Sequence, residues 1–179
     1  MLEQLNEFFD CIPEEERNLF QRIAEIALDN GYRIRRDKVK HIAYSFVSPR
    51  CKNGMMRFAY DKGKLFLKMK FFGVADYSEK FLSSLRATIE EHHFKYTGCY
   101  GCGKCNDQKE GYTILYENGM SYFRCGSEYI DIMNVEASDI AEIERIIVEQ
   151  THYYERMLPQ SPQGEFLGLQ KRRSAQFGN

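Results

Sequence analysis

Two tight-turn signals constrain the fold of this chain more than any other feature of its sequence. Asp61-Lys62-Gly63 and Asn118-Gly119 each lie between stretches with the alternating pattern of β-strands. Glycine and asparagine accept the positive φ that hairpin turns require, so both signals predict antiparallel strand pairs. The sequence therefore predicts an antiparallel sheet in which short turns join neighbouring strands.

The strand-like stretches form two groups, and a helix pattern follows each group. Apolar residues at helical spacing predict one helix that runs to about His93 and another that ends near Leu158. Two further helices are expected before Gly31. The predicted strands are His41–Ser48, Met55–Tyr60, Lys64–Phe72, Gly111–Glu117, Met120–Cys125 and Glu128–Met133. The prediction is an α+β fold of two N-terminal helices and two βββα units, with helices that cover an antiparallel sheet.

The length and composition predict one domain with a tail. The chain has 179 residues, of which 43% are apolar and 28% charged, as in soluble globular proteins. We expect a single α+β domain over residues 1–158 and a flexible tail over 159–179, because the tail holds two of the four prolines and little periodicity. No apolar run approaches the roughly 20 residues of a membrane helix, and the start lacks a signal-peptide pattern, so we expect a cytoplasmic chain.

A cysteine-rich loop over residues 97–110 separates the two predicted units. It contains the sequence TGCYGCGKCN, in which the cysteines are equally spaced at Cys99, Cys102 and Cys105. In a cytoplasmic chain, closely spaced cysteines favour metal binding or free thiols over a disulfide framework. A tetrahedral zinc site built on these thiols needs a fourth ligand.

Cys125 is the predicted fourth ligand. If Asn118-Gly119 is a two-residue turn, Cys125 faces Tyr112 at the base of the hairpin. The returning strand then brings Cys125 beside the end of the cysteine-rich loop. The predicted ligands of a structural zinc ion are therefore Cys99, Cys102, Cys105 and Cys125.

The cysteine spacing resembles two known metal-binding motifs. Cys99-Tyr100-Gly101-Cys102-Gly103 resembles the C-x2-C-G turn of zinc knuckles, which implies a metal-binding turn and no particular fold. The three equally spaced cysteines also resemble the start of the bacterial ferredoxin motif, although its next cysteine and proline are missing here. An iron–sulfur cluster completed by Cys125 is therefore an alternative cofactor, and a third alternative is free thiols without metal, with or without a redox role.

The other candidate metal ligands are less well placed. His92 and His93 could replace one thiol, but a histidine pair at a helix end more often contacts the last carbonyls or solvent. We expect Cys11 to be buried in the first helix and Cys51 to lie in a basic loop. As a whole, the chain resembles small bacterial α+β proteins with a cysteine cluster between a helix and a β-meander. That group has no assigned activity, so the resemblance implies no substrate.

The basic side chains are concentrated in one part of the chain. Residues 31–70 carry twelve basic and two acidic side chains, although the whole chain has a net charge of −1. Strand alternation predicts a basic and aromatic face, which we assign to an anionic ligand; its residues are Arg57, Phe66, Lys68, Lys70 and Phe72. Such faces also bind single-stranded nucleic acid. Alternatively, the lysines protect a sheet edge. A further alternative is that residues 31–70, called the basic block below, pair with the acidic helices within the chain or across a homodimer.

No catalytic motif was found. The sequence lacks G-x-S-x-G, H-E-x-x-H, G-x4-G-K-[ST] and G-x-G-x-x-G. We therefore expect a binding or regulatory domain rather than an enzyme, with a structural zinc site and an anionic small molecule or protein as partner. The alternatives are an iron–sulfur or thiol redox protein and a nucleic-acid-binding module.

Overall fold

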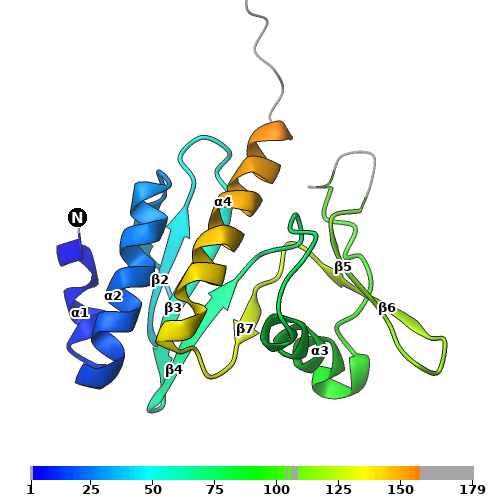
Figure 1. The fold of residues 1–179 in the computed structure, drawn as a ribbon, viewed down its shortest axis with the longest axis horizontal. Helices are drawn as coiled ribbons and strands as arrows, with labels where there is room; N and C mark the ends of the chain where they lie inside the picture. The colour runs from blue at the N-terminus through cyan, green and yellow to red at the C-terminus, as the bar shows by residue number, and fades with distance from the viewer. Residues whose placement is uncertain (1, 104, 106–108, 158–179) are drawn as a thin grey trace, which may run out of the picture.

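The computed structural model describes residues 2–103, 105 and 109–157 (Figure 1). The predicted tail over 159–179 lies outside the described residues. In chain order the elements are η1 (Leu2–Leu5), α1 (Asn6–Phe9), α2 (Glu14–Asp29), β1 (Arg33–Arg36), β2 (Ile42–Val47), β3 (Gly54–Asp61), β4 (Lys64–Met69), α3 (Glu79–Phe94), β5 (Gly111–Leu115), β6 (Ser121–Cys125), β7 (Ile130–Ile132), η2 (Ala137–Asp139) and α4 (Ile140–Arg156).

The strands form two antiparallel sheets, which confirms the α+β class. The larger sheet has the order β1-β2-β3-β4-β7, and β5 pairs with β6 in a separate sheet. The predicted chain order of two βββα groups is present after β1, as β2-β3-β4-α3 and β5-β6-β7-α4, but the groups are not separate units in space, because β7 pairs with β4 rather than with the β5–β6 hairpin. Ile130 and Ile132 lie opposite Met69 and Leu67, so β7 extends the apolar face of the larger sheet. β1 was not predicted, because its sequence RIRR has a single apolar residue.

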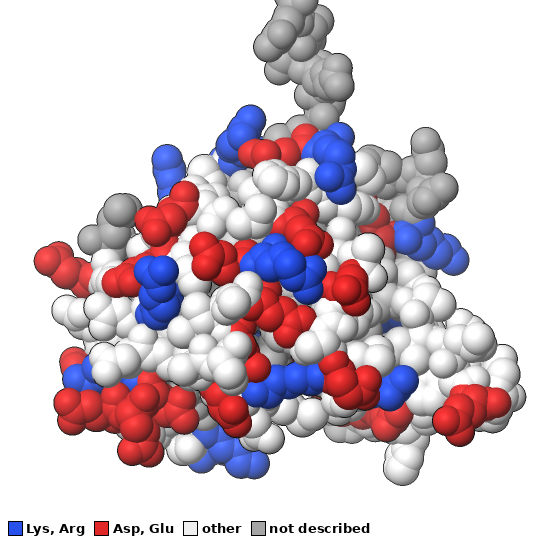
Figure 2. Space-filling model, in the orientation of Figure 1, with Lys and Arg blue, Asp and Glu red and all other residues white. Residues whose placement is uncertain are grey.

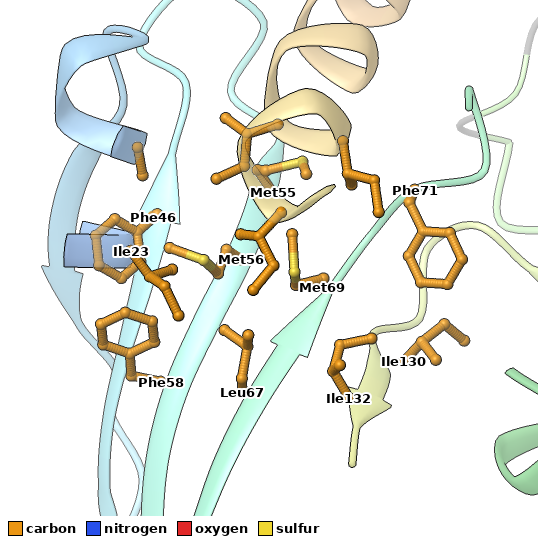
Figure 3. Packing of buried hydrophobic residues seen from close by; sticks show 14 of the residues in the cluster. Ile23, Phe46, Met55, Met56, Phe58, Leu67, Met69, Phe71, Ile130 and Ile132 are labelled. Carbon is orange, nitrogen blue, oxygen red and sulfur yellow. The ribbon is translucent and has the colours of Figure 1, made fainter. Parts of the chain in front are cut away.

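The helices α1, α2 and α4 cover one face of the larger sheet, in front of it in Figure 1. Their apolar side chains join those of the sheet in one buried cluster. A β-bulge widens this core: Phe46 pairs with Met56 and Val47 with Gly54, so Met55 has no partner residue in β2. As a result, Met55 and Met56 are both fully buried among the core side chains beneath α4 (Figure 3).

Acidic side chains gather over α1 and α2 on the helix-covered face of the molecule (Figure 2). Glu14, Glu15 and Glu16 occupy the first turn of α2, where carboxylates interact favourably with the helix dipole. The residues of the basic block lie mainly on the strands of the sheet behind these helices.

α3 and the β5–β6 hairpin lie beyond the β7 edge of the larger sheet (Figure 1). α3 packs against β7, where the Oγ of Ser84 accepts a hydrogen bond of 3.2 Å from the backbone N–H of Met133. The hairpin is fixed to the end of β4 by Tyr112, whose hydroxyl accepts a hydrogen bond of 2.8 Å from the N–H of Phe71. The open edge of β7 is therefore covered, which prevents pairing with another chain.

Candidate functional site

Three of the four predicted zinc ligands line one small cavity at the base of the β5–β6 hairpin. This cavity, called the thiol cavity below, has a volume of about 110 Å³. Its lining residues include Cys102, Cys105, Cys125, Lys70 and Phe72. Cys125 is buried, Cys105 is half-buried and Cys102 is exposed. The fold thus brings thiols that are twenty positions apart in the sequence to one cavity.

The predicted register of the hairpin is wrong by one residue. The N–H of Tyr116 donates to the carbonyl of Met120, so the loop has three residues, with Gly119 at a φ of 77°. Asn118 does not adopt a positive φ, and its side chain accepts a hydrogen bond of 3.0 Å from the N–H of Met120. A two-residue turn would need positive φ at both positions. Cys125 therefore faces Gly111 rather than the predicted Tyr112.

The start of the cysteine-rich loop runs alongside β6. Gly98 forms a parallel bridge with Arg124, and its N–H donates a hydrogen bond of 2.7 Å to the carbonyl of Phe123. In a parallel bridge the following residues of the two chains are also neighbours. Those residues are Cys99 and Cys125, so the first and last predicted ligands lie on adjacent backbone segments.

Backbone amides of the loop point toward two sulfur atoms. The N–H of Gly101 donates to the Sγ of Cys99, and the N–H of Glu110 donates to the Sγ of Cys105, both at 3.4 Å. Gly101 and Gly103 have φ values of 61° and 68°, which favour glycine and let the loop curl around the sulfurs. N–H donors stabilise thiolates, the form in which cysteine binds a metal.

The thiols are free and do not surround a common point. All six cysteines are unpaired, and among the described residues no group of three or more Cys, His, Asp or Glu side chains is placed to hold a metal ion. His92 contacts Glu91 and the ring of Tyr96 instead of the thiol cavity. The prediction that Cys11 is buried is wrong, because it is exposed in the turn after α1.

The residues of the predicted basic face are divided between two places. Arg57 and Lys68 are paired neighbours on the side of the sheet opposite the core, with Phe66 beneath the Lys68 ammonium at 5.0 Å. Lys70 and Phe72 lie beyond the end of β4 and line the thiol cavity. Phe72 packs against aromatic rings of β5 and α4, so it does not belong to a solvent-facing binding surface.

A second, larger cavity of about 370 Å³ lies between α3 and the face of the sheet that carries Arg57 and Lys68. We call it the cation-lined cavity. Its charged lining residues are Arg57, Lys68, Glu91, Arg124, Glu128 and Asp131. The sequence reasoning missed Arg124. An arginine between Phe123 and Cys125 inside a predicted strand was the signal that could have identified it.

The cations on the sheet side of this cavity already have carboxylate partners. The Nε of Arg57 lies 2.8 Å from the Oδ2 of Asp37, whose side chain is 7% exposed and also accepts a hydrogen bond from Ser45. The Nζ of Lys68 lies 2.6 Å from the Oδ1 of Asp131. These pairs fix the two cations in position and offset much of their charge.

Comparisons with protein-family models, with curated proteins and with solved structures gave no match for this chain. Among the described residues, every helix is too short or too polar to span a lipid bilayer. The chemistry of the two cavities is therefore the basis for inferring a function.

Proposed function

We propose that this chain is a zinc-binding domain in which four thiolates hold a structural zinc ion. The ligands are Cys99, Cys102, Cys105 and Cys125. One observation carries the proposal: Cys102, Cys105 and Cys125 line the thiol cavity, and the bridge between Gly98 and Arg124 brings the backbone that leads into Cys99 beside the backbone that leads into Cys125. Four thiolates that converge on one ion would match the preference of zinc for tetrahedral sulfur sites.

Binding of zinc would require the thiols to converge further. Thiolates repel one another until a cation offsets their charge, so the convergence of the ligands is coupled to binding of the metal. Cys99 and Cys102 are exposed, and their side chains are free to turn toward Cys125. Lys70 lines the same cavity, and its positive charge favours the anionic complex of zinc with four thiolates.

The zinc ion would act as a structural cross-link. The β5–β6 hairpin belongs to a separate sheet, and Tyr112 and the aromatic contacts of Phe72 hold its base against the body of the protein. A metal bound at Cys125 would join this hairpin base to the cysteine-rich loop. Its role would therefore be to stabilise the hairpin, with no open coordination position for catalysis.

A thiol redox function is the second candidate. Cys99 and Cys102 form a C-x2-C pair of exposed, free thiols, which suits formation of a reversible disulfide. Unlike a thioredoxin-type site, this pair does not begin a helix, because a turn with positive-φ glycines follows instead.

Metal analysis of freshly purified, untagged protein distinguishes these functions. We expect about one zinc per chain, no visible absorption band, and release of about four reactive thiols when the metal is chelated. Iron in the sample, together with a broad visible absorption band, would mean that the thiols hold an iron–sulfur cluster and not zinc. A protein that neither contains zinc nor takes it up during refolding with zinc would overturn the proposal and leave the redox function.

A further inference from the structure

The cation-lined cavity has the size and the polarity of a small-molecule site. Its volume of about 370 Å³ lies within the range of ligand pockets in proteins. It lies between α3 and the sheet, and it shares no lining residue with the thiol cavity. Its ligand is therefore a question separate from the zinc site.

Arg124 carries an unsatisfied hydrogen-bond donor in this cavity. Its side chain is 8% exposed, and its Nη1 donates a hydrogen bond of 2.8 Å to the carbonyl of Tyr96. Its buried Nε has no hydrogen-bond partner among the described residues. A buried donor without a partner is costly and rare, so it indicates a missing acceptor.

The open edge of the Arg124 guanidinium matches a carboxylate. Its Nη2 lies 3.9 Å from the Oε2 of Glu128, which is beyond hydrogen-bond distance. Nε and Nη2 lie on the same edge of the planar group and have no hydrogen-bond partner among the described residues, but Nε is fully buried, so a ligand reaches it only after the Arg124 side chain shifts. Two parallel N–H donors on one edge of a guanidinium bind the two oxygens of a carboxylate in a bidentate pair.

The positively charged side chains around the cavity are more buried than the negatively charged ones. The cations are the more buried groups, with side-chain exposures of 8% for Arg124, 27% for Lys68 and 31% for Arg57. Glu91 and Glu128 are 56% and 43% exposed, so they form an acidic rim. A ligand that fits this arrangement places a single negative charge inside and a positive charge at the rim.

We propose that the cation-lined cavity binds a free amino acid. The α-carboxylate pairs with the Nε and Nη2 of Arg124, and the α-ammonium, one carbon away, meets the carboxylate of Glu128. The rim carboxylates and the existing partners of Arg57 and Lys68 disfavour a phosphate dianion or a nucleic acid, because either adds more negative charge than Arg124 alone offsets. The side chain of the amino acid extends along the cavity toward α3.

Binding of amino acids to the full-length protein tests the proposal directly. The probes are the twenty proteinogenic L-amino acids, each titrated by calorimetry and by changes in the NMR spectrum. We expect at least one to bind with a dissociation constant below about 1 mM. Its N-acetyl and methyl-ester derivatives, each of which removes one charge, should bind roughly tenfold to a hundredfold more weakly. Failure of all twenty to bind would overturn the proposal.

Variants of the cavity locate the bound amino acid. Arg124→Gln should weaken binding by roughly tenfold or more, whereas Arg86→Gln, which removes a guanidinium from the exposed side of α3, should leave the affinity unchanged. Because Arg124 is buried and its loss can disturb folding, Ala87→Leu serves as a second variant. Ala87 is an exposed residue at the cavity, so a larger side chain there should block binding and leave the melting temperature intact. Full affinity in a folded Ala87→Leu variant would place the ligand elsewhere.

Glu128→Gln separates an amino acid from a simple anion. If Glu128 meets the ammonium group, its neutralisation weakens binding of the amino acid. If the ligand were a simple anion, the same substitution would remove a competing carboxylate from Arg124 and would strengthen the binding of acetate. An increase in affinity for acetate together with no loss for the amino acid would contradict the proposed orientation.

Discussion

Arg124 and Cys125 are consecutive residues of β6, and they line two different cavities. Arg124 lines the cation-lined cavity, and Cys125 lines the thiol cavity. The same segment forms the parallel bridge to Gly98 at the start of the cysteine-rich loop. A displacement of β6 at this point would move a proposed metal ligand and a proposed ligand-binding residue together, so we expect the two sites to be coupled.

The first prediction is that zinc and the amino acid bind cooperatively. If zinc is bound as proposed, its removal by a chelator would free Cys125 and loosen the end of β6, so Arg124 would be held less firmly. We expect the affinity for the amino acid to fall by roughly fivefold or more, as for a typical coupling between sites. By linkage, a saturating amino acid should lower the dissociation constant for zinc by the same factor. Equal amino-acid affinities of the metal-free and zinc-bound protein would disprove the coupling while leaving both sites in place.

The second prediction concerns the fourth zinc ligand. Cys125→Ser should lose the metal and destabilise the hairpin by about 2 kcal/mol or more, which lowers the melting temperature by roughly 4–8 °C in a chain of this size. Cys51→Ser is the matched control, because Cys51 lies in the loop before β3 and not in the thiol cavity. The two variants are compared by metal content and by thermal unfolding. Unchanged zinc content in Cys125→Ser would rule out the proposed ligand set.

Local signals predicted most strands of the larger sheet, and long-range contacts account for what was missed. β2, β3 and β4 were predicted because each is a short stretch rich in apolar and aromatic residues, and the turn signal Asp61-Lys62-Gly63 joins β3 to β4. The position of β7 depends on Ile130 and Ile132 finding Met69 and Leu67, about sixty residues earlier in the chain. That pairing is decided by the free energy gained when β7 extends the shared apolar face. The periodicity of the sequence gives no information about which strand β7 will pair with.

The same limit applies to the candidate sites. The cysteine spacing predicted three of the metal ligands and the hairpin turn predicted the fourth, and the bridge between Gly98 and Arg124 places the segments that lead into Cys99 and Cys125 side by side. The register error at Asn118 arose because its side-chain oxygen accepts a hydrogen bond from the N–H of Met120, which favours a three-residue loop and which a rule based on residue type does not include. Arg124 was missed because its burial depends on how the rest of the chain packs around the hairpin, and its position between Phe123 and Cys125 in a predicted strand was the only local indication of it.

The third prediction tests the β-bulge in β3. Met55 and Met56 are both fully buried, although neighbouring residues of a regular strand point to opposite faces. We expect Met55→Ala to destabilise the protein by about 2–4 kcal/mol, because it leaves a cavity in the core. Met133→Ala, at a position that is 45% exposed, should change stability by less than about 0.5 kcal/mol. Equal effects of the two substitutions in urea unfolding would show that Met55 points to solvent.

The fourth prediction concerns stability at alkaline pH. Burial raises the pKa of Tyr32 from 10.0 to about 12. Thr151 donates its own proton to the carbonyl of Ile147, so the Tyr32 hydroxyl donates to the Oγ1 of Thr151 at 2.9 Å. Above pH 10 the unfolded chain loses the Tyr32 proton before the folded protein does. Stability is therefore fully present below pH 10 and falls by about 2–3 kcal/mol as the pH rises to 12.

Tyr32→Phe should remove the part of this dependence that comes from Tyr32, whereas other tyrosines whose pKa burial raises, such as Tyr154, keep theirs. At pH 8 the variant should be less stable than the wild type by about 1 kcal/mol, because it lacks the hydrogen bond to Thr151. In urea unfolding at pH 8, 10 and 11, we expect the difference to shrink above pH 10 and then to reverse. Thr151→Val keeps the buried phenol and should keep the steep alkaline loss of stability. A difference between wild type and Tyr32→Phe that stays constant from pH 8 to pH 11 would mean that Tyr32 ionises equally well in the folded and unfolded chain.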